Sequence, residues 1–313
     1  MTRPPDGLAQ AAADYWNKEV VEQAYSSWTA DLQVRARINT MVTGDRHTWP
    51  LDWFAHRLPK PFERGLSIGC GPGHLERQAI RLGICRRIDG LDISEESLAA
   101  ARRTAEEEGM ADAIRYARGD FNNPSLPRNK YDIVFFGFSL HHVAKLEKLF
   151  RHVLRALRPD GVVYFEEYVG PSASEWNPER LRTPSTVYAL LPREWRIHET
   201  LPMPVNLSDP SEAIRSSEIL RQLRVGFEIV EKRDFGGNLL AILYQAIDWD
   251  VAPREAVGLL LEAEQALLAS GEESFYSVVV ARPVRGAKRL LARARYFFVP
   301  KHRRAWRAVR KHS

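Results

Sequence analysis

From Arg64 to Gly170 the chain alternates short apolar segments with amphipathic segments of helical length, which constrains the fold more than any other feature. The apolar segments at 65–69, 86–93, 112–121, 131–140 and 162–170 predict five strands. Segment 131–140, YDIVFFGFSL, is apolar on both faces, which is typical of a strand buried in a parallel sheet. Crossovers of helical length between the strands predict an α/β protein with a doubly wound parallel sheet.

The segments on either side predict the rest of the architecture. Residues 1–60 are rich in aromatic side chains at helical spacing and predict an N-terminal helical cap. Residues 171–210 hold seven of the 19 prolines and predict an insertion after strand five that lies over the sheet. Helical segments at 211–223 and 254–271, with strands at 226–236 and 274–283, complete a seven-stranded sheet within a predicted domain of residues 61–283.

Charge is distributed unevenly along the 313 residues. Residues 284–313 carry 11 Lys and Arg and no Asp or Glu, so the remaining chain has 34 basic residues against 40 acidic ones. Two cysteines cannot form a disulfide framework, and no Cys/His cluster has zinc spacing, so we expect no metal and a reducing cytoplasmic location. No apolar run approaches the roughly 18 residues of a membrane-spanning helix.

A glycine-rich turn follows the first predicted strand, in the sequence LSIGCGPGHLER. In an open α/β sheet, ligands bind beyond the carboxyl ends of the strands, where this turn would lie. Gly69, Gly71 and Gly73 have the spacing G-x-G-x-G, whereas the dinucleotide pattern is G-x-G-x-x-G, which disfavours a nicotinamide-dependent oxidoreductase. Asp92 ends the second strand and Asp120 ends the third; Asp92 could accept hydrogen bonds from a ribose diol in either class of ligand.

Five ordered segments resemble the motifs of class I S-adenosylmethionine-dependent methyltransferases, most closely bacterial enzymes that act on small molecules: LSIGCGPGHLER, GLDIS, ARGDF, YDIVFFGFSLHHV and LRPDGVVYFEEY. The resemblance implies a seven-stranded Rossmann-like sheet with an antiparallel last strand pair, and S-adenosylmethionine as the cofactor. It places the ribose on Asp92 and the adenine on Asp120 and Phe121. The implied cofactor-binding residues are Ser67, Gly69, Cys70, Gly71, Gly73, Asp92, Ile93, Asp120 and Phe121.

One position departs from this family. Its members usually carry Asp or Glu two residues before the first glycine, where the acid serves the amino group of the cofactor, and this chain has Ser67. A serine can accept a hydrogen bond but supplies no charge. The departure leaves open a non-catalytic scaffold that binds the cofactor.

Candidate catalytic residues follow the fourth and fifth strands. His141 and His142 lie at the predicted cleft, and an imidazole is a suitable general base near neutral pH. The resemblance favours His142, because the second histidine often faces the methyl group of the cofactor; a packed histidine that only orients a loop is the alternative. Glu166 and Glu167 end strand five beside them, and one of the two could orient an imidazole or accept a substrate proton.

These residues predict methyl transfer to an oxygen of a small or lipid-linked acceptor. A nucleic-acid acceptor is not expected, because strand four lacks an Asn/Asp-Pro-Pro-aromatic run and the acidic body offers no surface for phosphates. We expect aromatic side chains of the first 60 residues and of the insertion to cover a partly apolar pocket.

The basic tail, 284–313, predicts a further partner. In segment 286–300 the apolar residues share one sector of a helix, and the basic residues lie elsewhere on it. This pattern predicts binding to an anionic membrane surface; docking on the acidic body of the protein and RNA binding are the alternatives. The apolar sector consists of Ala287, Leu290, Leu291, Ala294, Phe297 and Phe298.

Overall fold

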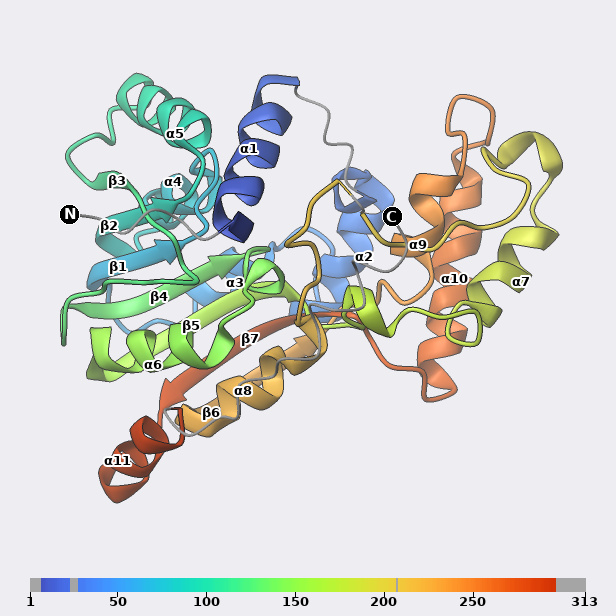
Figure 1. Cartoon of the computed structure of the whole chain (residues 1–313). Coiled ribbons are helices and arrows are strands. Elements are labelled where there is room, and N and C mark those ends of the chain that lie inside the picture. Colours follow the sequence, from blue (N-terminus) through green and yellow to red (C-terminus); the bar gives the residue numbers. More distant parts are fainter. Residues whose placement is uncertain (1–6, 23–27, 207, 297–313) are drawn as a thin grey trace.

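A computed structural model describes residues 7–22, 28–206 and 208–296 of the chain (Figure 1). Its centre is one seven-stranded sheet with the strand order β3-β2-β1-β4-β5-β7-β6. The strands are β1 (Phe62–Ile68), β2 (Cys85–Asp92), β3 (Ile114–Arg118), β4 (Tyr131–Gly137), β5 (Leu157–Tyr168), β6 (Phe227–Asp234) and β7 (Tyr276–Pro283).

The direction of the strands decides where a site can form. The first five strands pair in parallel, whereas β7 pairs antiparallel with both β5 and β6. The sheet reverses its order between β1 and β4, so the turns that follow these two strands diverge at one edge. The predicted doubly wound sheet and its antiparallel last pair are confirmed.

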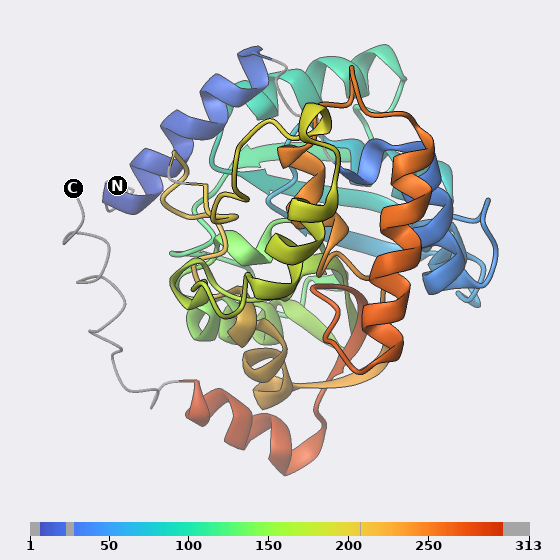
Figure 2. The ribbon, with the colours of Figure 1, turned by 90° about the vertical axis from the view of Figure 1, so that its right-hand side faces the viewer.

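Helices lie on both faces of the sheet (Figures 1 and 2), and a hydrophobic core fills the space on each face. On one face α6 (Leu146–Ala156) and α8 (Ile219–Gly226) pack against side chains such as Phe136 and Phe165. On the other face α2 (Leu32–Thr43), α3 (Pro50–Ala55) and α10 (Glu255–Ala269) contribute to a core that includes Phe135 and Tyr164. Helix α4 (His74–Arg81) follows β1, and α5 (Glu95–Glu107) packs against β3.

The N-terminal helices have two different positions. Helices α2 and α3 bury Val34, Ile38, Trp53 and Phe54 in the same core as the strands. Helix α1 (Gly7–Glu22) instead packs against α5, beside the glycine-rich turn, and its Ala13 contacts Ile93. In Figure 1 α1 stands above the edge of the sheet where β1 and β4 end.

The predicted insertion, 171–210, forms α7 (Arg182–Leu190) and extended chain that lies beside α9 (Leu240–Leu243), on the right in Figure 1. The helix predicted at 211–223 is wrong in its first half, because α8 begins only at Ile219 after a short 3-10 turn. Ala213 has a φ of 45°, a left-handed conformation that an α-helix does not continue. Residues 209–215 therefore form a loop, and this loop reaches the predicted histidines.

The tail begins with α11 (Gly286–Arg295), which docks on α8. Ala292 and Tyr296 are buried in the core beneath it, and the Tyr296 hydroxyl donates a hydrogen bond of 2.9 Å to the carbonyl of Gln222. Neither residue belongs to the predicted apolar sector, of which Leu290 and Leu291 are 68% and 60% exposed. Phe297, Phe298 and the rest of the tail lie outside the described residues. Among the described helices, none has the length and hydrophobicity needed to cross a bilayer.

Candidate functional site

The glycine-rich turn after β1 has one open position. All three glycines have positive φ, but a side chain at Gly69 would collide with Ser139, and one at Gly73 would collide with Tyr116. At Gly71, with a φ of 51°, an added Cβ would meet no atom within 4 Å. Protein packing therefore requires the first and third glycines, and the second is where a ligand can approach the backbone.

Asp92, at the end of β2, holds this turn in place. Its carboxylate accepts a hydrogen bond of 2.7 Å from the backbone N–H of Gly71 and one of 2.9 Å from that of Ser94. Ser94, not Asp92, caps α5 by accepting the N–H of Ser97. Burial raises the pKa of Asp92, and the two backbone N–H groups oppose the shift. A largely buried carboxylate beside the open glycine fits the ribose-binding role that the resemblance implies.

The other predicted cofactor residues surround the same turn. The Asp120 carboxylate accepts hydrogen bonds from Asn122 and Asn123, so it forms the turn after β3. Phe121 and Ile93 line a hollow of about 20 Å³ between this turn and α1. The Cys70 side chain is buried on the far side of the turn, against Gly90 of β2. Ser67 lies in β1 and is only 1% exposed.

Replacement of Asp92 by asparagine is expected to weaken the binding of S-adenosylhomocysteine about 10- to 100-fold. The loss corresponds to the roughly 1.5–3 kcal/mol of a hydrogen bond to a charged group. Calorimetric titration measures it, with Asp89→Asn as the control, since Asp89 lies in the same strand but pairs with Lys130 and Tyr131. Equal affinity in the Asp92 variant and the unchanged protein would contradict the role of Asp92.

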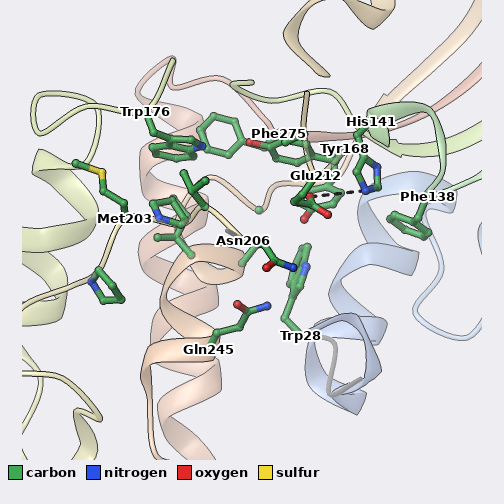
Figure 3. A pocket seen from close by; sticks show the side chains of 18 of the residues that line it. Trp28, Phe138, His141, Tyr168, Trp176, Met203, Asn206, Glu212, Gln245 and Phe275 are labelled. Atoms are coloured by element: carbon green, nitrogen blue, oxygen red, sulfur yellow. Dashed lines mark ion pairs between the residues drawn. The ribbon is translucent and has the colours of Figure 1, made fainter. Parts of the chain in front are cut away.

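A cavity of about 660 Å³ opens at the turn after β4 (Figure 3). Its walls come from α1, the turn after β4, the predicted insertion and the segment around α9. Eight aromatic side chains line them, and Glu212, His141, Asn206 and Gln245 are among the polar groups (Figure 3). The aromatic side chains are Tyr15, Trp16, Trp28, Phe138, Tyr168, Trp176, Phe275 and Tyr276.

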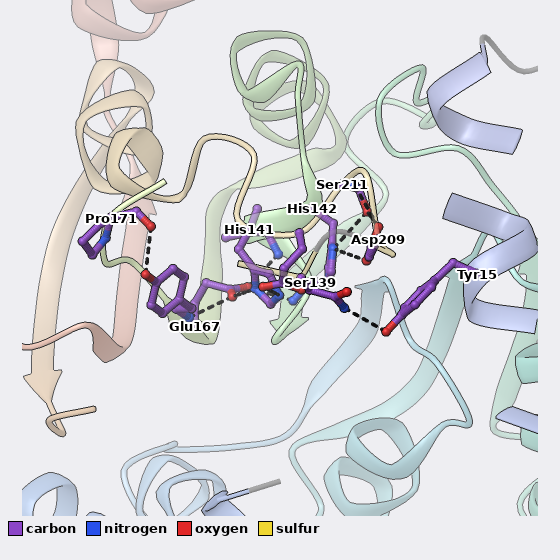
Figure 4. Close-up of polar contacts among 12 residues, drawn as sticks. Tyr15, Ser139, His141, His142, Glu167, Pro171, Asp209 and Ser211 are labelled. Carbon is purple, nitrogen blue, oxygen red and sulfur yellow. Dashed lines mark hydrogen bonds and ion pairs between the residues drawn. The ribbon is translucent and has the colours of Figure 1, made fainter. Parts of the chain in front are cut away.

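His141 lies in the short 3-10 helix Leu140–His142, where Glu167 of β5 holds it (Figure 4). The Glu167 carboxylate contacts Nδ1 of His141 and accepts hydrogen bonds from the backbone N–H groups of Ser139 and Leu140. Nε2 of His141 faces Glu212 at 3.7 Å. Burial opposes the charge on this ring, but Glu167, Glu212 and Asp209 outweigh it and raise the pKa of His141 to about 9. His141 is therefore a charged, fixed group at neutral pH.

His142 has a different set of partners (Figure 4). Its Nδ1 lies 3.1 Å from Oγ of Ser211 and 3.3 Å from Oδ2 of Asp209. The Ser211 hydroxyl donates to Asp209 at 2.6 Å, so both oxygens accept at the Nδ1 side. In the neutral ring Nε2, which faces Glu212 at 3.9 Å, is then the acceptor. His142, with Trp16, lines both the large cavity and the small hollow beside Phe121.

The structure separates the two predicted glutamates. Glu167 joins His141, whereas Glu166 lies on the other face of β5, where it accepts a hydrogen bond of 2.7 Å from Tyr164. Sequence reasoning missed Asp209, Ser211 and Glu212, which contact the histidines from about 70 residues away along the chain. Their segment, Asp-Pro-Ser-Glu, carries no periodic signal that would have marked it.

The absence of a metal stays a prediction. His141, His142 and Glu212 bring one ligand atom each within 4.8 Å of one another, a cluster that could hold a metal ion. Against this, the charged His141 ring offers no lone pair unless it loses its proton.

Known proteins match the region that carries the glycine-rich turn and the histidines. Residues 66–165 match the family model described as a methyltransferase domain. A sterol 24-C-methyltransferase of Gibberella zeae is 30% identical over 37% of this chain and 31% of its own length. Another, of Aspergillus fumigatus, is 26% identical over 63% of this chain and 47% of its own. The chain thus spans less than half the length of these two relatives.

Solved structures share the fold over most of the chain. The cyclase SpnF has a TM-score of 0.55 at 18% identity, covering 91% of this chain and 100% of its own. Geranyl diphosphate C-methyltransferase from Streptomyces coelicolor also has a TM-score of 0.55, at 14% identity and 90% coverage of this chain and 100% of its own. The sheet order, the turn after β1 and the family match agree, and residues 66–165 form a methyltransferase domain of the class I S-adenosylmethionine-dependent type.

Proposed function

We propose that this chain transfers the methyl group of S-adenosylmethionine to an oxygen atom of a small, largely apolar acceptor. The observation that carries the proposal is the position of His142. Its ring lines both the large cavity and the hollow beside Ile93 and Phe121, which are predicted cofactor residues. A base at that boundary lies where an acceptor and a cofactor would meet.

The large cavity suits such an acceptor in size and chemistry. A volume of about 660 Å³ lies within the ordinary range for sites that bind small molecules. Its aromatic side chains favour an apolar or isoprenoid body. Polar groups line it in more than one place, Asn206 and Gln245 among them, and His141, His142 and Glu212 lie together. An acceptor with its oxygen toward this group would present that oxygen to the base.

The chain's own groups then determine the chemistry at that oxygen. When bound, S-adenosylmethionine supplies an electrophilic methyl group on a sulfonium. His142 accepts the hydroxyl proton at Nε2, and Asp209 stabilises the resulting imidazolium through Nδ1. Burial alone would raise the pKa of Asp209, but contacts with His142 and Ser211 hold it below its usual value, so Asp209 is charged. Positioning of the acceptor contributes roughly 7–11 kcal/mol in reactions of this kind.

Carbon is the second candidate acceptor atom. The sterol and geranyl diphosphate enzymes named above are C-methyltransferases by name. Methylation of an alkene leaves a cationic carbon, and aromatic faces such as those of Trp16, Trp28 and Tyr168 stabilise cations. The identity of the methylated atom separates the two candidates.

Transfer of a labelled methyl group tests the proposal. The protein is incubated with methyl-labelled S-adenosylmethionine and a fractionated cell extract that includes lipids. We expect label in an organic-soluble product, released as methyl iodide by hot hydriodic acid, which cleaves methyl ethers but not carbon-carbon bonds. Label retained on carbon would select the second candidate. Binding of the cofactor without transfer to any fraction would favour the non-catalytic scaffold.

We also propose that α11 brings the enzyme to an anionic membrane surface and so to a lipid-linked acceptor. Because Ala292 and Tyr296 anchor this helix, Leu290 and Leu291 point away from the body of the protein with exposed Lys288 nearby in the sequence. The segment from 284 to 313 adds 11 basic residues and no acidic ones, which complements anionic headgroups. The cytoplasmic location itself stays a prediction.

Substitution of both exposed leucines tests membrane binding. Leu290→Glu/Leu291→Glu is expected to reduce cosedimentation with phosphatidylglycerol vesicles at least about tenfold, because each leucine buried in lipid contributes roughly 1.5–3 kcal/mol. Leu190→Glu/Leu259→Glu is the matched control, since these leucines of α7 and α10 are equally exposed. Equal binding by both double variants, or no binding by the unchanged chain, would contradict the proposal.

A further inference from the structure

The first turn of α4 carries a buried carboxylate without a partner. Glu76 is 0% exposed, and within the described part of the chain neither of its carboxylate oxygens forms a hydrogen bond of ordinary geometry. Buried acids are normally paired, because an unpaired carboxylate loses its hydration without compensation. Among the described residues Glu76 therefore has no ion pair, and Ser67 is the uncharged group in reach of it.

The groups around Glu76 are already engaged or uncharged. Arg77, the next residue, donates to the carbonyl of Pro72 at 2.7 Å and pairs with Glu108 at 3.2 Å. The Ser67 hydroxyl of β1 faces the carboxylate, as do Cys70 of the turn and Tyr116 of β3. Asp92 of β2 adds a second negative charge. Since Arg77 is engaged by Glu108 and Asp92 adds negative charge, a charged Glu76 would be stabilised by a further cation.

Glu76 differs in this respect from the other buried carboxylate at the turn. Both oxygens of Asp92 accept backbone N–H groups, from Gly71 and Ser94. Neither oxygen of Glu76 accepts a backbone N–H. The methionine part of S-adenosylmethionine carries an ammonium group, and Ser67, near the end of β1, lies within hydrogen-bond reach of Glu76.

We propose that Ser67 and Glu76 together hold the ammonium group of the cofactor, Ser67 by hydrogen bond and Glu76 by charge. The ammonium donates to Oγ of Ser67, and the Ser67 hydroxyl donates to the Glu76 carboxylate. Glu76 thereby supplies the negative charge that residue 67 lacks. The inference rests on the proposed cofactor and identifies Glu76 as a positioning residue, because it acts through Ser67.

A proton change accompanies binding under this arrangement. Burial and the charge of Asp92 raise the pKa of Glu76 to about 7, against the opposing effects of Ser67, its own backbone N–H and Arg77. Near neutral pH Glu76 is thus partly protonated. A bound ammonium lowers its pKa, so binding releases part of a proton, and affinity increases as pH rises through about 7.

Two ligands that differ only in the amino-acid part separate this role from a structural one. Glu76→Gln is expected to weaken S-adenosylhomocysteine binding about tenfold, the cost of one charge-assisted interaction. Methylthioadenosine, which has no ammonium group, should bind both proteins equally. Ser67→Asp/Glu76→Gln should restore the affinity for S-adenosylhomocysteine, and Glu96→Gln, which removes an exposed charge from α5, is the control.

Calorimetry on the unchanged protein provides a second readout if the variant folds poorly. At pH 7, titrations in two buffers of different ionisation enthalpy should show proton release with S-adenosylhomocysteine and none with methylthioadenosine. Equal proton release with both ligands, or equal weakening of both by Glu76→Gln, would overturn the inference and make Glu76 a structural acid. If the unchanged protein bound neither ligand, the proposed cofactor itself would be wrong, and the inference with it.

Discussion

Replacement of His142 by alanine is expected to lower kcat about 10²–10⁴-fold, the range that a general base contributes to a reaction. The residue lies between the two hollows, with Nδ1 held by Ser211 and Asp209 and Nε2 left to accept a proton. Loss of the imidazole removes the acceptor for the hydroxyl proton, but it leaves the turn after β1 intact. The affinity for S-adenosylhomocysteine should therefore stay unchanged.

Single-turnover rates with saturating cofactor measure this effect directly. Asp209→Asn should lower the same rate by a smaller factor, because the imidazole remains but its orientation and positive charge lose support. His152→Ala is the matched control, since this histidine lies in α6 and does not line the cavity. Unchanged turnover in His142→Ala would remove His142 from the mechanism, and a loss of cofactor affinity would reassign it to binding.

The sequence predicts the sheet well because its strands and helices differ in periodicity. The segment 131–140 is continuously apolar, and the structure forms β4 there, although the strand ends at Gly137. Phe138 takes a φ of 52° and turns its ring into the cavity, so the last apolar residues of the segment leave the sheet. The apolar pattern therefore predicts that a strand forms here, but it does not predict that the strand ends before the pattern does.

The partners of the histidines could not be predicted in the same way. Glu167 lies on β5, the strand next to β4 in the sheet, so the strand pattern predicts that it lies near the histidines. Asp209 and Glu212 lie in a loop without periodicity, and only the tertiary fold brings this loop near the histidines. Residues 211–223 have the composition of a helix, and the left-handed Ala213 interrupts it where the loop meets the site.

The contacts of the tail could not be predicted from the sequence either. Helical periodicity identifies an apolar sector, but not which face of the helix the protein itself covers. The structure uses a different face, through Ala292 and Tyr296, because Tyr296 can pack on Gly226 and donate to Gln222. The predicted sector is left exposed at Leu290 and Leu291.

Replacement of Glu167 by alanine is expected to lower the free energy of unfolding by about 3–5 kcal/mol, the cost of breaking a buried ion pair from one side. Glu167 is 0% exposed and supports the backbone of Ser139 and Leu140 as well as His141. Without it, three N–H groups, of Ser139, Leu140 and Tyr168, and the charged ring lose their acceptor in the interior. Urea unfolding followed by circular dichroism measures the loss.

Glu167→Gln isolates the charge from the backbone contacts, because an amide oxygen still accepts the N–H groups of Ser139 and Leu140. The folded pKa of His141, about 9, lies above that of an unfolded histidine, near 6.5, so the ion pair contributes its full stability below pH 6.5. That contribution decreases as pH rises through about 9 and His141 loses its proton. The stability difference between the unchanged protein and Glu167→Gln should therefore be largest at pH 6 and shrink by pH 9.5. A difference that does not vary with pH would mean that Glu167 acts on the backbone alone and that His141 carries no charge in the folded protein.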